Sequence, residues 1–198
     1  MTAIPVSPAT VPWTLPRRGP VAILFFILAE SAIFAVFVSA YLYYIGRSLT
    51  GPTPREVLHF PVVMTVCLLS SSLTIHTAKR ALARGATATF MRYWLATILL
   101  GAGFLYGTAR EWYELIAVHH LTLRTNLFGS TYYALVGLHA SHVIAGMGML
   151  IIVAAFGLMR RVRAEHAERV DVISTYWHFV DVVWIVVFSV VYLWGLIA

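Results

Sequence analysis

The stretch VAILFFILAESAIFAVFVSAYLYYI, from Val21 to Ile45, decides the fold of this chain. Glu30 is its only charged residue. A run of about 20 apolar residues is long enough to cross the hydrocarbon core of a bilayer as an α-helix. This run is also too long for the apolar region of a cleavable signal peptide. The stretch therefore predicts a transmembrane helix over residues 21–45.

Four further apolar runs follow, at about residues 61–82, 93–118, 129–159 and 172–197. Inside a bilayer each must be helical, because only helices and closed barrels satisfy their backbone hydrogen bonds there. The composition agrees, since 60% of the residues are hydrophobic and 11% are charged, whereas a water-soluble domain carries about 25% charged residues. The fold class is therefore predicted to be all-α, a polytopic membrane protein with a bundle of five transmembrane helices.

The first twenty residues differ from the rest because proline recurs at every third or fourth position. The prolines are Pro5, Pro8, Pro12, Pro16 and Pro20. This spacing disfavours a helix and favours an extended path. We therefore expect a Pro-rich cytoplasmic surface arm over residues 1–20 and a five-helix transmembrane domain over residues 21–198.

Basic residues concentrate in the N-terminal arm and in the second and fourth loops between the predicted spans. They are Arg17, Arg18, Lys79, Arg80, Arg84, Arg92, Arg160, Arg161, Arg163 and Arg169. The first and third loops carry only Arg47, Arg55 and Arg124. Since basic loops stay on the inner side of a membrane, the N-terminus is predicted in the cytoplasm and Ala198 outside. The net charge of +6 therefore reflects membrane orientation, and no nucleic-acid partner is expected.

Several ionisable side chains lie inside the apolar runs, where each is costly and should face protein instead of lipid. They are Glu30, His76, Arg110, Glu111, Glu114, His139, His142, His178 and Asp181. The pairs His139/His142, His178/Asp181 and Glu111/Glu114 are each three residues apart and share a helix face. Glu30, His139, His142 and Asp181 are predicted at similar depth on three helices.

Three interpretations of these buried groups remain open from the residues alone. Paired histidines with carboxylates on neighbouring helices can bind a metal ion or haem. The same residues can instead form a network of hydrogen bonds between helices that fixes their packing. Glu30 and Asp181 could also relay protons.

Long motifs in the last two spans resemble a known family. Phe128-Gly-Ser-Thr-Tyr-Tyr133, followed by Gly137-Leu-His139-Ala-Ser-His142-Val-Ile, is similar to a signature of heme-copper oxidase subunit III. Tyr176-Trp-His178-Phe-Val-Asp181-Val-Val-Trp184 resembles the motif in that family's last helix. Ala29-Glu30-Ser31 resembles its membrane-embedded glutamate, and Glu111-Trp-Tyr-Glu114 resembles its Glu-Tyr-x-Glu stretch.

The resemblance implies cytochrome c oxidase subunit III in its five-helix bacterial form, in the bacterial cytoplasmic (inner) membrane. Larger family members have seven helices, with a lipid-holding cleft between the first two and the rest, and this chain resembles only the last five. The family's activity is dioxygen reduction to water coupled to proton translocation. This subunit is then a non-catalytic scaffold that stabilises subunit I and supports proton uptake.

The resemblance also implies partners and cofactors. Haem and copper belong to the partner subunits I and II, and this chain is expected to bind neither metal nor redox cofactor. Phospholipid is an expected ligand, and a larger respiratory supercomplex is a further partner. We expect nine residues to form a buried polar network, which could also contact lipid or subunit I. They are Glu30, His76, Glu111, Glu114, His139, His142, His178, Asp181 and Trp184.

Two kinds of alternative function stay open at this point. Within the same fold, the chain could be subunit III of a quinol oxidase or an accessory protein of a nitric oxide reductase. From another class, it could be an independent transporter or proton channel, which would transport without partner subunits.

Overall fold

The structure is a computed structural model that describes residues 18–194, and over that range it contains helices, turns and loops without a strand. Its long helices are α1 (Arg18–Tyr44), α3 (Val62–Ala83), α4 (Thr87–Ala117), α5 (Leu127–Leu158) and α6 (Ala167–Phe188), and the π-helix η2 (Ser189–Trp194) continues α6. The one-turn helix α2 (Pro54–Val57) and the 3₁₀ helix η1 (Ala164–His166) lie in loops. Five helical spans are long and apolar enough to cross a membrane. The predicted all-α fold with five membrane-spanning helices is confirmed.

The helix ends differ from the predicted spans, chiefly on the side where the chain begins. Helix α1 begins at Arg18, so Pro20 lies in its first turn, where a missing backbone N–H costs nothing. Prolines 5 to 16 of the predicted arm lie outside the described residues. Helix α4 begins at Thr87 instead of residue 93, and α6 at Ala167 instead of residue 172. Hydropathy identifies only the apolar part of a helix. The first turns of α4 and α6 contain polar residues, so these helices begin before their apolar runs.

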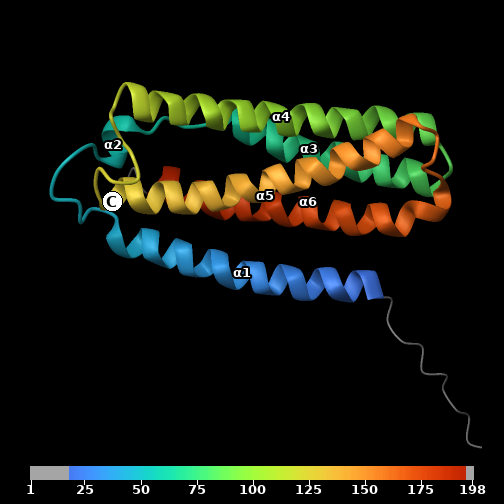
Figure 1. The fold of residues 1–198 in the computed structure, drawn as a ribbon, viewed down its shortest axis with the longest axis horizontal. Coiled ribbons are helices and arrows are strands. Elements are labelled where there is room, and N and C mark those ends of the chain that lie inside the picture. Colours follow the sequence, from blue (N-terminus) through green and yellow to red (C-terminus); the bar gives the residue numbers. More distant parts are fainter. Residues whose placement is uncertain (1–17, 195–198) are drawn as a thin grey trace, which may run out of the picture.

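Four of the long helices form a bundle, and α1 lies outside it. Helices α3, α4, α5 and α6 pack in a ring in which each lies mainly along two neighbours, while α1 packs against α5 and α6 (Figure 1). Within the most apolar window of α1 only 6% of residues are buried, compared with 50% in the span that contains α6. Helix α1 therefore has a large apolar surface that lipid or another subunit must cover.

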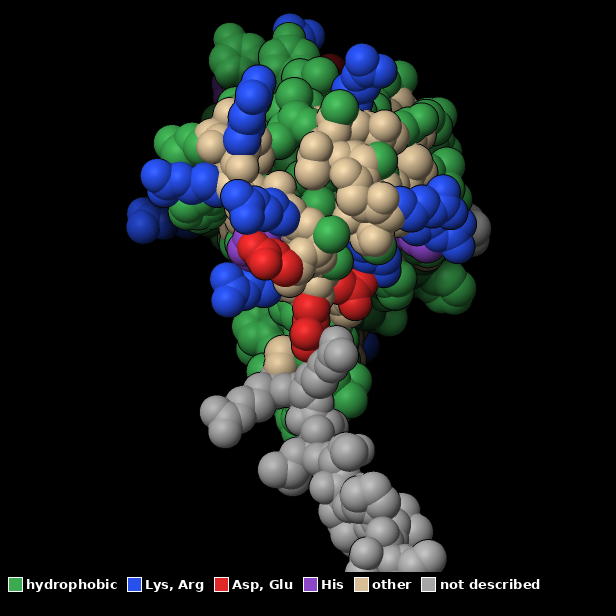
Figure 2. Space-filling model, turned by 90° about the vertical axis from the view of Figure 1, so that its right-hand side faces the viewer, with side chains coloured by type: hydrophobic (Ala, Val, Ile, Leu, Met, Phe, Trp, Pro, Cys, Tyr) green, Lys and Arg blue, Asp and Glu red, His purple; other side chains and the backbone are tan. Residues whose placement is uncertain are grey.

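The basic loops meet at one end of the molecule. The α3–α4 turn, the α5–α6 loop and the beginning of α1 lie together at the right-hand end of Figure 1. Figure 2 views this end and shows Lys and Arg side chains around it, with a few acidic side chains among them. We call it the basic end. The Lys79 Nζ to Asp171 Oδ1 ion pair, 2.6 Å long, joins α3 to α6 there.

Trp177 of α6 lies at the centre of the bundle and is fully buried. Its indole Nε1 donates a hydrogen bond to Ser71 Oγ of α3 at 2.8 Å. Its ring lies against two glycines: a Cβ added to Gly101 of α4 would lie 2.9 Å from Trp177 Cη2, and one added to Gly146 of α5 would lie 2.8 Å from Cε3. Because neither glycine has a side chain, α4 and α5 can both approach the indole.

Replacing Gly146 with alanine is expected to destabilise the chain by about 1–3 kcal/mol, because the added methyl overpacks the Trp177 ring. The free energy of unfolding of the full chain in detergent measures the change. Gly148→Ala is the matched control, since a Cβ there meets no atom within 4 Å. Equal losses from both substitutions would show that the Trp177 contact does not limit packing.

Candidate functional site

The Glu30 carboxyl of α1 meets an imidazole of α5. Glu30 Oε2 lies 3.0 Å from His142 Nε2, and both side chains are largely buried. His142 Nδ1 lies 2.8 Å from the Leu138 carbonyl oxygen, which can only accept, so Nδ1 carries a proton. The contact between His142 Nε2 and Glu30 Oε2 needs one proton between the two atoms, and this proton can belong either to the Glu30 carboxyl or to the His142 ring. In both cases the pair has no net charge, which suits a site at bilayer depth.

A second polar contact joins α3 to α6. The hydroxyl of Ser72 lies 2.9 Å from His178 Nδ1 and is also hydrogen-bonded to Asp181 Oδ2. His178 and Asp181, three residues apart on α6, therefore share one hydroxyl on the neighbouring helix. The sequence predicted that these two residues share a face, and they do. It did not identify Ser72, because a serine within an apolar run gives no ionisable signal.

His139 is fully buried but belongs to no hydrogen-bonded network in the described residues. Its ring stacks on Trp184 with centroids 5.2 Å apart, and the edge of Phe104 meets it at 5.7 Å. Neither ring nitrogen has a hydrogen-bond partner within residues 18–194. Trp184 turns its own Nε1 to Thr65 Oγ1, at 3.2 Å. Although His139 and His142 are three apart, they point into different surroundings, one aromatic and one acidic.

Of the three predicted site residues nearer the ends of the bundle, one is hydrogen-bonded to another helix and two are exposed. The Tyr192 hydroxyl lies 2.8 and 2.9 Å from the two carboxylate oxygens of Glu111 of α4 and donates its one hydrogen to this carboxylate. Glu114 and His76 are exposed. The structure thus divides the expected network into separate contacts, Glu30 with His142, Ser72 with the α6 pair, and Glu111 with Tyr192. Tyr192 was missed because tyrosines near helix ends are read as interfacial residues.

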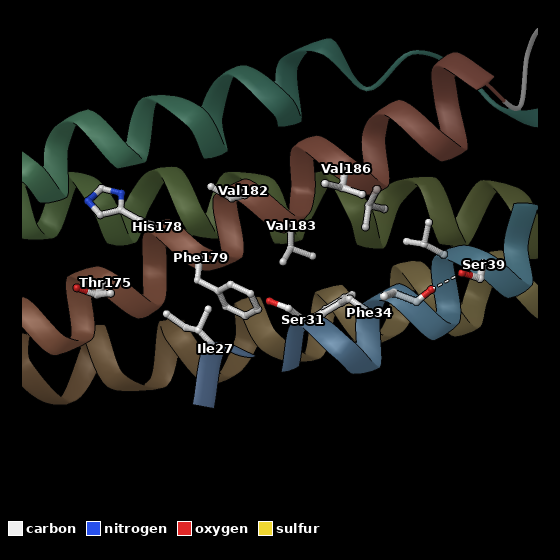
Figure 3. A pocket seen from close by; sticks show the side chains of 13 residues that line it. Ile27, Ser31, Phe34, Ser39, Thr175, His178, Phe179, Val182, Val183 and Val186 are labelled. Atoms are coloured by element: carbon white, nitrogen blue, oxygen red, sulfur yellow. Dashed lines mark hydrogen bonds between the residues drawn. The ribbon is translucent and has the colours of Figure 1, made fainter. Parts of the chain in front are cut away.

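A groove of about 680 Å³ runs between α1 and α6 (Figure 3). Apolar side chains such as Ile27, Phe34 and Phe179 form most of its walls. His178 lies at one end, with its ring directed toward α3 and away from α1. The groove is therefore mostly apolar, with His178 and Thr175 at one end, Ser31 between and Ser39 at the other end.

The ligand geometry for a metal ion is lacking in the part of the chain that the structure describes. No three His, Cys, Asp or Glu side chains gather closely enough to hold an ion within residues 18–194. Each buried histidine or carboxyl is instead engaged by an aromatic ring, a hydroxyl or one oppositely polar group from another helix. This arrangement can fix helix packing and can hold or pass protons.

Comparison with known proteins gives matches that are named as subunit III of an oxidase. Residues 20–196 match the family model described as cytochrome c oxidase subunit III. Cytochrome c oxidase subunit 3 of Alkalihalophilus pseudofirmus is 34% identical over 86% of this chain and 84% of its own length. That of Bacillus sp. (strain PS3) is 36% identical, over 87% and 84%. Cytochrome bo(3) ubiquinol oxidase subunit 3 of Pseudomonas aeruginosa is 33% identical, over 86% and 82%.

Proposed function

The chain belongs to the cytochrome c oxidase subunit III family, and we propose that within its oxidase it acts as a scaffold without a redox cofactor of its own. It is subunit III of a heme-copper oxidase, a multi-pass membrane protein and a member of a multi-subunit oxidoreductase complex. In the proposal, haem and copper belong to subunits I and II. This chain packs against subunit I, stabilises it and supports its proton uptake.

The observation that carries the proposal is how the buried polar groups are bonded. The Glu30–His142 contact fastens α1 to α5, Ser72 fastens α3 to α6, and Tyr192 fastens the end of the last span to Glu111 of α4. Bonds of this kind hold helices in register. Glu30, His142, Asp181 and Glu111, which could otherwise serve as metal ligands, are thus bonded between helices, which supports a structural role in the complex.

The apolar surface of α1 supports contact with other molecules in the membrane. We place the expected phospholipid in the groove between α1 and α6, whose walls suit acyl chains. The remaining exposed surface of α1 suits a helix of subunit I or a further subunit. The proposal also assigns the basic end to the cytoplasmic side of a bacterial inner membrane, because its loops hold most of the Lys and Arg residues.

We take cytochrome c to be the electron donor of the complex, as in the names of the Alkalihalophilus and Bacillus relatives. A quinol remains the second candidate, because the bo(3) relative is similar over nearly the same share of the chain. A copper-binding cysteine pair in the accompanying subunit II would identify the cytochrome c class.

The test is purification of the complex in mild detergent, with mass spectrometry of its subunits and a visible spectrum. Subunits I and II should co-purify with this chain. Removal of the chain should leave the haem spectrum and the initial rate of electron transfer nearly unchanged, while fewer turnovers precede inactivation. Stoichiometric iron, copper or zinc on the separated polypeptide would contradict the scaffold role.

A further inference from the structure

Asp181 is a buried carboxyl that has no cationic partner among residues 18–194. Its side chain is 3% exposed, and in the described residues its only hydrogen-bond partner is the Ser72 hydroxyl, on Oδ2. The other oxygen, Oδ1, has none. A carboxylate in such surroundings costs several kcal/mol unless a cation or several donors compensate it. Since neither is present, the geometry favours the neutral acid, which carries a proton.

The contacts around Ser72 permit only a few arrangements of protons. The hydroxyl has one proton and lies within hydrogen-bond distance of His178 Nδ1 and of Asp181 Oδ2. If Asp181 is the neutral acid, it donates to Ser72 Oγ, and Ser72 donates its own proton to His178 Nδ1. All the hydrogen bonds then point from the buried acid toward the imidazole.

His178 extends this chain of bonds toward the basic end. Its ring is half-buried, and toward the beginning of α6 the next acidic residue is Asp171, which pairs with Lys79 of α3. Along α6 it is about 10 Å from Asp171, at 1.5 Å per residue. The Glu30 and His142 side chains of α1 and α5 bond to each other instead. In the part of the chain that the structure describes, ionisable groups therefore continue from Asp181 toward the basic end.

We propose that Asp181, Ser72 and His178 form a proton relay through which a buried acid exchanges its proton with water at the basic end. In the transfer, the Asp181 O–H bond breaks as Ser72 Oγ accepts that proton. The Ser72 O–H bond breaks as His178 Nδ1 accepts the other. The products are an aspartate and an imidazolium, no electron moves, and water at the basic end exchanges protons with the imidazolium. The relay does not depend on the scaffold role, because it uses only side chains of this chain.

Infrared difference spectroscopy of the purified oxidase tests the relay. The spectrum of the wild type minus that of Asp181→Asn should contain the C=O band of a protonated carboxylic acid. On transfer to D₂O this band should shift as the proton exchanges. Ser72→Ala should keep the band but slow the shift by about 100-fold, because a positioned proton-transfer group has been removed. Ser72→Thr, which retains the hydroxyl, should restore the exchange.

Ser70→Ala is the matched control, since Ser70 lies two residues away on α3, is also half-buried and has no role in the relay. It should exchange at the wild-type rate. A difference spectrum without an acid band would overturn the proposal, as would equal exchange rates in Ser72→Ala and Ser70→Ala. Should Asp181→Asn fail to assemble, the test is whether any acid C=O band exchanges more slowly in Ser72→Ala than in both the wild type and Ser70→Ala; the lack of such a band would overturn the proposal.

Discussion

Replacing Trp177 with alanine should lower the free energy of unfolding of this chain by about 3–5 kcal/mol, the range for large aromatic side chains in cores. Trp177 contacts three other helices at one level of the bundle, through Ser71 of α3, Gly101 of α4 and Gly146 of α5. Truncation leaves a cavity bounded by two glycines, which have no side chains to fill it. It also leaves the Ser71 hydroxyl without its indole donor.

The measurement is denaturant or thermal unfolding of the full chain in detergent. Trp194→Ala is the control, because the Trp194 side chain is 56% exposed and its loss should change stability little. If both substitutions cost the same, membrane-facing and central tryptophans contribute equally, and the central position of Trp177 has no special role.

The sequence predicted the number and approximate position of the spans because hydropathy reports directly on the bilayer. It failed at the beginning of α4, where Thr87 to Arg92 continue the helix beyond the apolar run. Helical structure at such a position depends on backbone hydrogen bonding and not on hydropathy. The position of α1 beside the bundle could not be predicted either, since an all-round apolar helix gives no preferred face.

For the site, the sequence indicated which ionisable residues lie within the spans, but it did not define the groups that they contact. His139 and Glu30 were expected in one network, yet His139 packs between Trp184 and Phe104. Whether a buried histidine meets an acid or an aromatic ring depends on helix rotation, which spacing within one helix does not define. The sequence also missed Ser72, because only its contacts with two residues of α6 make it part of the site.

Few polar contacts hold α1 against α5 and α6. A substitution in the Glu30–His142 pair should therefore have the second large effect. Lipid solvates an apolar helix nearly as well as another apolar helix does, so apolar contacts alone hold α1 weakly. Glu30 and His142 are the groups of α1 and α5 that gain most from staying together. Separating them would place both polar groups in hydrocarbon.

Glu30→Leu should therefore destabilise the packing of α1 by about 3 kcal/mol, because His142 loses its partner while it stays at bilayer depth. In the oxidase the same change should loosen assembly and shorten the working life of the enzyme, with the haem spectrum retained. Faster hydrogen exchange in α1, followed by mass spectrometry, reports the loosening. An enzyme that loses its haem spectrum at once would place Glu30 at the redox centre instead.

The double variant Glu30→Leu/His142→Leu separates the cost of an orphaned polar group from the value of the bond itself. Replacing both partners with apolar residues removes the unpaired group, so the double variant should be more stable than either single variant. Glu30→Gln retains a hydrogen-bonding group beside His142 and should lose less than Glu30→Leu. Additive losses in the double variant would mean that the two side chains act independently and that their bond to each other does not hold α1.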